Sequence, residues 1–182
     1  MSEYCYSPLL AERDSIRLLR LLPDKNKHST IKCEIVDYSL ESGGSTHLYE
    51  ALSYVWGDPK ATRQIFGGGY YINVTISLYS ALVSLRNHAL ERTLWVDAIC
   101  INQADEQEKE QQIPLMAKIY GQAACVLVWL GENTDNSDQA LQDISLAAQG
   151  EPISWTDEAR KTAILDILER PWFRRIWVSA PN

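Results

Sequence analysis

The 182-residue sequence predicts an α/β protein with a mainly parallel central sheet, flanking helices and an N-terminal strand or hairpin addition. Short apolar runs of strand length alternate with stretches in which apolar residues recur every three or four positions. From residue 49 onward the expected order is strand, hairpin, helix, strand, helix, strand, helix, helix, which is typical of parallel sheets covered by helices. Hydrophobic residues make up 46% of the chain and charged residues 23%, an ordinary globular composition.

Two strands are expected before this alternation begins. The segments 16–22 and 31–38 have the composition of strands, and the polar segment 23–30 joins them as a loop. The segment ESGGST, residues 41–46, is typical of a turn or short linker. We therefore assign residues 1–48 to N-terminal strands and a linker that lead into the main domain.

The first core strand is expected at 49–55, where apolar residues fall on both faces as in a covered strand. A hairpin should follow at 63–74 and turn at the three consecutive glycines 67–69. Three glycines could also cradle a phosphate, but no helix follows them directly and no Lys-Ser/Thr pair is present, so a turn is favoured. Thr75 should then cap a helix with the apolar stripe Leu78, Ala81, Leu82 and Leu85.

The second and third core strands are expected at 94–99 and 124–130. The helix between them carries an apolar stripe at Ile113, Met116, Ala117 and Tyr120. Pro114 lies inside this helix, which should bend or break there because proline lacks a backbone donor and disfavours helical geometry before it. Two further helices are expected at 137–148 and 156–168.

Polar side chains gather directly after the first two core strands. In open α/β sheets ligands bind beyond the carboxyl ends of the strands, so these two segments should face one crevice if the strands are neighbours. The segment after the second strand also holds Cys100 and Asp105. The residues that we expect to bind a substrate are Trp56, Gly57, Asp58, Asp97, Asn102 and Gln103.

Position by position, structural roles are the favoured interpretation of this junction. Asp105 followed three residues later by Glu108 is a capping-box pattern, in which Glu108→Gln should cost about 1 kcal/mol at most. The two amides could bond loop backbone, and Asp97 could pair with an arginine such as Arg92 or Arg174. Both interpretations can hold together, since a capping carboxylate can also face a pocket.

Several function classes find no support in the sequence. The net charge of −7 and the pI near 5.0 disfavour nucleic acid as a partner. The four cysteines form no C-x-x-C pair, so we expect no metal site and free buried thiols. No signal-peptide pattern is present and no apolar run approaches the about 20 residues of a membrane span, which predicts a cytoplasmic protein. The common hydrolase motifs G-x-S-x-G and H-E-x-x-H are absent from the sequence.

Four sequence blocks, YEALSYVWG, LWVDAICINQADEQEKEQQ, MAKIYGQAACVLVWLG and RPWFRRIWV, closely resemble the heterokaryon incompatibility (HET) domain of filamentous fungi. The resemblance implies a role in fungal non-self recognition and programmed cell death, with self-association or other incompatibility proteins as partners. It also implies a distant relation to TIR domains, which have a flavodoxin-like fold and in some cases cleave NAD with a glutamate on the helix after a sheet strand. By this resemblance Glu108 is the candidate catalytic residue, with NAD as a candidate substrate and no cofactor.

The final block departs from the family's pattern, which usually continues Trp-x-x-Gln-Glu after this point. This chain instead ends Trp177-Val178-Ser179-Ala180-Pro181-Asn182. We therefore expect a C-terminally truncated HET domain at 49–178 and an atypical tail at 179–182. Two alternatives to an NAD-cleaving effector stay open: a non-enzymatic adaptor that self-associates, and an inactive truncated fragment.

Overall fold

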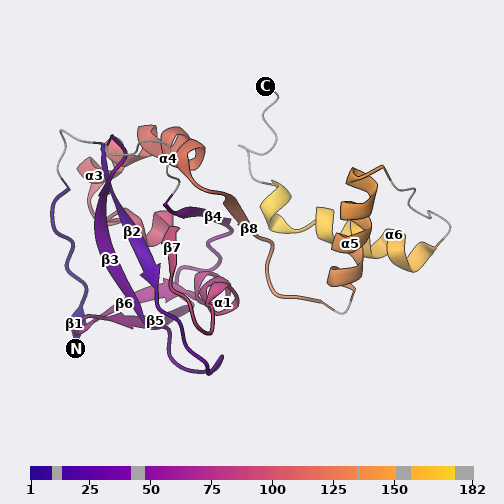
Figure 1. Ribbon diagram of the computed structural model, residues 1–182, viewed down its shortest axis with the longest axis horizontal. Coiled ribbons are helices and arrows are strands. Elements are labelled where there is room, and N and C mark those ends of the chain that lie inside the picture. The colour runs from indigo at the N-terminus through magenta and orange to yellow at the C-terminus, as the bar shows by residue number, and fades with distance from the viewer. Residues whose placement is uncertain (10–13, 42–47, 135, 151–156, 175–182) are drawn as a thin grey trace. The chain divides into compact units, whose positions relative to one another are not determined.

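The computed structural model describes residues 1–9, 14–41, 48–134, 136–150 and 157–174. The chain divides into two compact units, Met1–Trp129 and Leu130–Asn182, which are taken separately below. Figure 1 shows their elements, with the sheets in the first unit and a pair of helices in the second.

The first unit is built on a five-stranded sheet of order β3-β2-β7-β4-β8. β4 is parallel to β7 and β8, whereas β2 is antiparallel to β3 and β7. The strands are β2 (Ser15–Leu21), β3 (Cys33–Ser39), β4 (Glu50–Tyr54), β7 (Arg92–Trp95) and β8 (Val126–Trp129). The three predicted core strands therefore share one parallel set, but the sheet as a whole is mixed rather than mainly parallel.

The two N-terminal strands belong to the central sheet and are not an addition beside it. β2 lies between β3 and β7, and Ile16, Leu18, Leu19 and Leu21 on it are at most 2% exposed. Both faces of this strand are thus covered, which explains why it is apolar apart from Ser15, Arg17 and Arg20. A strand buried to this degree is part of the folding core.

The second core strand ends at Trp95, four residues earlier than the sequence predicts. Residues 97–100 instead form the short helix α2 (Asp97–Cys100). The Asp97 carboxylate accepts a hydrogen bond from the Ala98 amide at 2.8 Å, and the amides of Ile99 and Cys100 donate to the Val96 carbonyl. An aspartate that bonds the amides of a first turn favours a helix start over a strand interior.

A three-stranded sheet of order β1-β6-β5 completes the first unit. Its strands are β1 (Ser2–Glu3), β5 (Thr62–Gly67) and β6 (Tyr70–Thr75), so the predicted hairpin is confirmed. Gly68 and Gly69 turn it with φ of 47° and 92°, values that favour glycine. Thr75 caps α1 (Ile76–Leu85) by accepting from the Leu78 amide, as expected.

Pro114 interrupts the helix after Asp105, as the sequence predicts. α3 (Glu106–Gln112) passes into a 3₁₀ turn (Ile113–Leu115) and then into α4 (Met116–Gln122). The predicted apolar stripe is confirmed in part, because Met116 and Tyr120 pack against the core. Ile113, however, is 57% exposed, while Glu108, Gln112 and Ile119 are buried. The polar side chains of Glu108 and Gln112 face inward because each has a hydrogen-bonding partner on β2.

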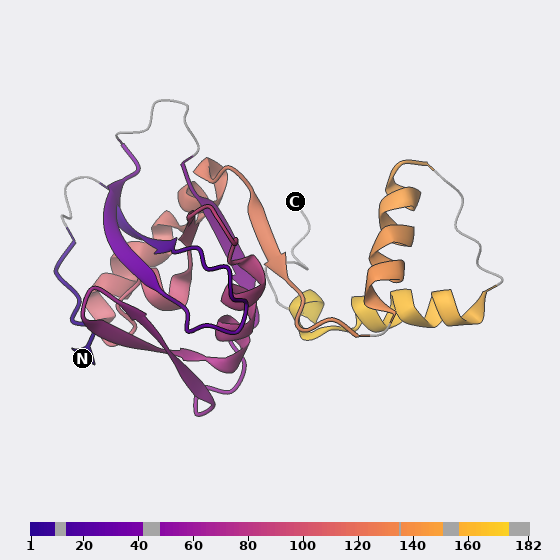
Figure 2. The same cartoon turned by 60° about the horizontal axis from the view of Figure 1, so that its bottom comes forward.

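α3 and α4 pack against the same side of the sheet, and hydrogen bonds from side chains to backbone carbonyls hold them there. The Gln112 amide donates to the Ser15 carbonyl at 2.9 Å, and the Tyr49 hydroxyl donates to the Ile119 carbonyl at 2.6 Å. Figures 1 and 2 both show these helices together on one side of the strands. α1 and the three-stranded sheet contribute to the same continuous hydrophobic core, which includes Leu19, Leu52, Ile65, Leu78, Leu82, Trp95 and Ile119.

The second unit contains α5 (Ser137–Ala148) and α6 (Glu158–Leu168), followed by a 3₁₀ turn (Pro171–Arg174). Both predicted helices are confirmed, although Thr156 and the predicted tail 179–182 lie outside the described residues. A small cluster of Ala140, Ala163, Ile164 and Ile167 joins the two helices. Within the described parts of the chain, no helix has the length and apolar character needed to cross a membrane.

Candidate functional site

The carboxyl ends of β4 and β7 lie at the same edge of the sheet because these strands are parallel neighbours. Trp56 follows β4 and Asp97 follows β7. The Trp56 indole Nε1 donates to the Asp97 carboxylate at 3.0 Å, and Trp56 is 39% exposed. The structure thus brings together the two polar segments that the sequence places after these strands.

Gln103 joins this pair from the loop after α2. Its side-chain Nε2 donates to the Asp97 backbone carbonyl at 2.9 Å. We considered Arg92 as a partner of Asp97, and this prediction is wrong. Arg92 pairs with Glu50 instead, and its Nη2 lies 2.9 Å from the Glu50 Oε1. The pairing of Asp97 with Arg174 stays a prediction. Trp56, Asp97 and Gln103 form what we call the edge cluster.

Gly57 and Asp58 shape the loop that presents Trp56. Gly57 has a φ of +76°, and a Cβ built on it would lie 3.3 Å from the Ser77 Cβ, so a side chain here is disfavoured twice. The Asp58 carboxylate accepts from the Lys60 amide at 2.9 Å, and its carbonyl accepts from the Ala61 amide. Asp58 therefore stabilises a turn, and no contact joins it to the edge cluster among the described residues.

Asn102 and Asp105 organise the loop on the other side of the cluster. The Asn102 side chain accepts from the Ala104 amide at 3.2 Å, as in an Asx turn. Asp105 caps α3 by accepting from the amides of Gln107 and Glu108 at 3.0 and 3.1 Å, so the predicted cap is confirmed. The second half of the capping box differs, because the Glu108 carboxylate accepts from the Asn102 amide at 2.7 Å instead.

Glu108 lies in the protein interior, whereas we expected its side chain to point into an open crevice. It is 8% exposed, and its Oε1 and Oε2 accept from Nη1 and Nη2 of Arg17 at 2.5 and 3.0 Å. Arg17 is 1% exposed. A guanidinium buried on β2 requires a counterion, and Glu108 supplies it. The crevice orientation of Glu108 is therefore corrected to a buried ion pair.

Arg17 is a member of this site that our sequence analysis missed. Its Nη1 also donates to the Cys100 carbonyl at 3.3 Å, and its Nη2 donates to the Ser7 carbonyl at 2.5 Å. Burial opposes its charge, but the hydrogen bond and the charge of Glu108 outweigh that effect and leave the Arg17 pKa raised. The available signal was an arginine between Ile16 and Leu18 in the apolar run 16–22, which also holds Arg20. A charge buried in such a strand needs a partner that is distant in the sequence.

Tyr6, near the N-terminus, packs against the arginine of this ion pair. The Arg17 guanidinium lies 4.9 Å from the centre of the Tyr6 ring, a cation–π distance. The Tyr6 hydroxyl donates to the Ile99 carbonyl at 2.8 Å. Burial raises the pKa of this hydroxyl, which keeps it a donor at neutral pH. Residues near the N-terminus thus hold α2 and the loop that carries Gln103.

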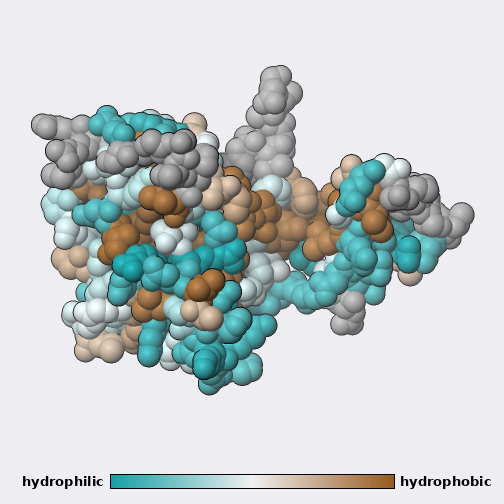
Figure 3. All heavy atoms as spheres, in the orientation of Figure 1, coloured by the Kyte–Doolittle hydropathy of each residue, from teal (hydrophilic) through white to brown (hydrophobic). Residues whose placement is uncertain are grey.

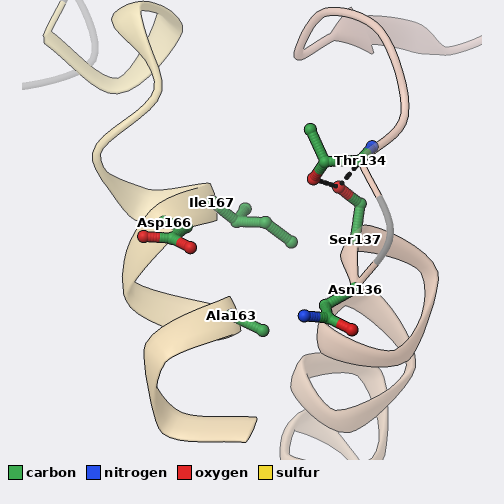
Figure 4. Close-up of a pocket in the computed structure, with 6 residues that line it drawn as sticks. All are labelled: Thr134, Asn136, Ser137, Ala163, Asp166 and Ile167. Carbon is green, nitrogen blue, oxygen red and sulfur yellow. Dashed lines mark hydrogen bonds between the residues drawn. The ribbon is translucent and has the colours of Figure 1, made fainter. Parts of the chain in front are cut away.

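The edge cluster offers an indole, a carboxylate and an amide, a set that can bind a planar ring and a hydroxyl group. No group of three metal-ligating side chains lies in the described residues. Pockets lined by described residues lie elsewhere. One of about 240 Å³ lies in the second unit between α5 and α6 (Figure 4), and one of about 340 Å³ lies beside Ser15 and Gln112. Neither is lined by Trp56, Asp97 or Glu108.

Comparison with known proteins identifies the family. The model of the family described as Heterokaryon incompatibility protein (HET) matches residues 49–179. Heterokaryon incompatibility protein 6, OR allele, from Neurospora crassa is 37% identical over 147 residues, which cover 74% of this chain and 21% of that protein. The chain spans about a fifth of the length of this curated relative. No solved structure matches. Because the family model covers well over half of the sequence, the chain belongs to the heterokaryon incompatibility (HET) family.

Proposed function

We propose that this chain acts in heterokaryon incompatibility, the response in which filamentous fungi recognise non-self after hyphal fusion and undergo programmed cell death. The observation that carries the proposal is the family match over residues 49–179, together with the incompatibility protein of Neurospora crassa that is 37% identical. Within the first unit we propose the edge cluster as the functional surface, because two of the family-like sequence blocks meet in it at the carboxyl ends of parallel strands.

We further propose that the parallel half of the sheet is TIR-like or flavodoxin-like. β4, β7 and β8 are the first, second and third parallel strands along the chain, and they stand in the order β7-β4-β8. Flavodoxin-like sheets begin with the same order, second-first-third. The antiparallel strands β2 and β3 depart from that fold, so the proposal is limited to the three strands that carry the edge cluster.

Cleavage of NAD is a second proposed function, supported by the position of the edge cluster at the carboxyl ends of parallel strands. An indole can stack on a nicotinamide or adenine ring, and a carboxylate can stabilise an oxocarbenium-like ribosyl centre. Asp97 is a half-buried carboxylate at this edge, where it accepts from the Trp56 indole, whereas Glu108 lies buried against Arg17. We therefore propose Asp97 as the substrate-facing carboxylate and Glu108 as the buried counterion of Arg17, outside the chemistry.

A cell-death assay tests the incompatibility function. The chain is expressed from an inducible promoter in Neurospora crassa hyphae, and dead compartments are counted with a vital dye. We expect death on induction, and loss of death with Trp56→Ala at equal protein abundance. Leu90→Ala, an exposed apolar position at 70% exposure, is the matched control and should kill like the wild type. Absence of killing by the wild type, or killing by Trp56→Ala, would contradict the proposal.

An assay of nicotinamide release tests NAD cleavage separately. Purified protein is incubated with NAD and the release of nicotinamide is followed by chromatography. We expect Asp97→Asn to lower the rate by about 100-fold or more, and Glu110→Gln, on the exposed face of α3, to leave it unchanged. Killing of cells without any nicotinamide release would instead support the adaptor alternative, in which the edge cluster binds a protein partner.

A further inference from the structure

The loop that carries Trp56 is distinguished by its attachments rather than by a hydrophobic surface. In Figure 3 hydrophobic and hydrophilic residues are interspersed over much of the first unit. The Ser77 hydroxyl donates to the Val55 carbonyl at 2.6 Å, and the Ile76 amide donates to the Ala61 carbonyl at 2.9 Å. Two successive residues in the first turn of α1 therefore hold the two ends of this loop.

Ser77 acts from a rigid support. Leu78, the next residue, is fully buried, and so are Ala81 and Leu82 further along α1. The start of the helix is also capped, because Thr75 accepts from the Leu78 amide at 3.3 Å. A group on an anchored helix places its partner more precisely than a group on a loop does. The Ser77 hydroxyl thus imposes the geometry of α1 on the loop.

The same serine adjoins the loop on the other side of Trp56. Gly57 has a φ of +76°, and a Cβ built on it would lie 3.3 Å from the Ser77 Cβ. The backbone of the loop therefore approaches α1 closely, and glycine permits this approach. Val55 and Gly57 flank Trp56 in the sequence, so Ser77 holds the backbone on both sides of the tryptophan.

We propose that Ser77 is a positioning residue for Trp56. The Trp56 indole donates to the Asp97 carboxylate at 3.0 Å, and a backbone held on both sides fixes the direction from which the indole reaches that carboxylate. A ring that is ordered in advance loses less conformational entropy when a ligand binds to it. The inference rests on the proposed function of the edge cluster, and it adds α1 to the elements that build this cluster.

Heteronuclear NMR of the indole N–H groups in the full chain tests the proposal. The sequence has six tryptophans, and the resonance of Trp56 is the one lost in Trp56→Phe. We expect Ser77→Ala to move this resonance toward the position of an unbonded indole, because the loop is released and the bond to Asp97 weakens. Gly57→Ala should move it too, because it disturbs the same contact from the loop side.

Ser84→Ala is the matched control, since it removes an exposed serine hydroxyl from the same helix. It should leave every indole resonance in place. A Trp56 resonance that stays unchanged in Ser77→Ala would overturn the proposal. Equal movement of all the indole resonances would overturn it too, because the serine would then act on the fold in general and not on Trp56.

The kinetics of nicotinamide release connect the position of Trp56 to the proposed function. We expect Ser77→Ala to raise the KM for NAD about fivefold and to change kcat by less than about twofold, because a stacking ring binds the ground state and the transition state alike. A fall in kcat with KM unchanged would overturn the positioning role. Movement of the Trp56 resonance as expected, with no nicotinamide release by any chain, would contradict the proposed NAD cleavage alone.

Discussion

Arg17 and Glu108 lie 91 positions apart in the sequence and form a bidentate ion pair inside the first unit, with N–O distances of 2.5 and 3.0 Å. Arg17 comes from β2, upstream of the family match, and Glu108 comes from α3 within it. Through the Asn102 amide and the Cys100 carbonyl the pair also holds the start of the loop after α2. The N-terminal strands and the edge cluster are therefore coupled through one pair of charges.

Glu108→Gln should destabilise the protein strongly, by about 3 to 5 kcal/mol, because it leaves the Arg17 charge buried without a counterion. This replaces the loss of at most about 1 kcal/mol that a simple helix cap predicts. Urea unfolding followed by tryptophan fluorescence measures the change. The control is Glu106→Gln, an exposed glutamate on the same helix, which should change the free energy of unfolding by less than about 1 kcal/mol.

Arg17→Met combined with Glu108→Met should be much less destabilising than the sum of the two single changes. Methionines of similar length fill the space, and no charge is left unpaired. Some loss should remain, since the Asn102 amide and the Cys100 carbonyl lose partners. A double-mutant cycle that shows additive effects would mean that the two side chains are not energetically coupled.

Removal of residues 1–48 should abolish cooperative folding, although the family match begins at residue 49. The deletion removes β2 and β3 from the central sheet and takes Arg17 away from Glu108. Thermal unfolding by circular dichroism compares residues 49–182 with the full chain. Tyr6→Phe provides a graded comparison and should cost about 1 kcal/mol through the lost hydrogen bond to Ile99. A sharp unfolding transition in the deleted chain would refute this account of the folding unit.

Two of the four cysteines should react with a thiol reagent in the folded protein. Cys5 and Cys125 are exposed, whereas Cys33 and Cys100 are buried, and burial raises the pKa of each buried thiol to about 12. The buried pair should therefore react at least about 100-fold more slowly. Ellman's reagent counts the reactive thiols, with urea as the control in which all four react. Rapid reaction of four thiols in the native state would count against the fold.

The Glu50–Arg92 pair should make stability depend on pH in the acid range. The hydrogen bond from Arg92 holds the pKa of Glu50 below its ordinary value of 4.5. A lowered pKa in the folded state stabilises the protein above the unfolded pKa, and this contribution is lost as the pH falls through the folded value. The difference in unfolding free energy between the wild type and Glu50→Gln should therefore shrink below about pH 4.5. A difference that stays constant down to acid unfolding would contradict the prediction.

Elements governed by local rules could be read from the sequence. The glycines at 67–69, the Thr75 cap, the Asp105 cap and the break at Pro114 each follow from the conformational preferences of a few adjacent residues, and the structure has all four. The parallel relation of β4, β7 and β8 was also predictable, because each crossover contains a helix. The contact between Trp56 and Asp97 follows from that relation.

Features that depend on distant partners could not be read in the same way. Nothing near Glu108 in the sequence shows that its partner lies on β2, so Glu108 was expected to face an open crevice instead of a buried arginine. The insertion of β2 beside β7 likewise depends on pairing between strands more than 70 residues apart. Such pairings depend on the packing of the whole core, so the local hydrophobic pattern does not predict them.

The central claim is that the Glu108 carboxylate serves as the buried counterion of Arg17 and takes no part in chemistry. The most direct measurement is the cell-death assay with the Arg17→Met/Glu108→Met chain, carried out below its unfolding temperature and at an abundance matched to the wild type. We predict that this chain still kills cells and that Asp97→Asn does not. A folded Arg17→Met/Glu108→Met chain that fails to kill would contradict the account and return Glu108 to the reacting site.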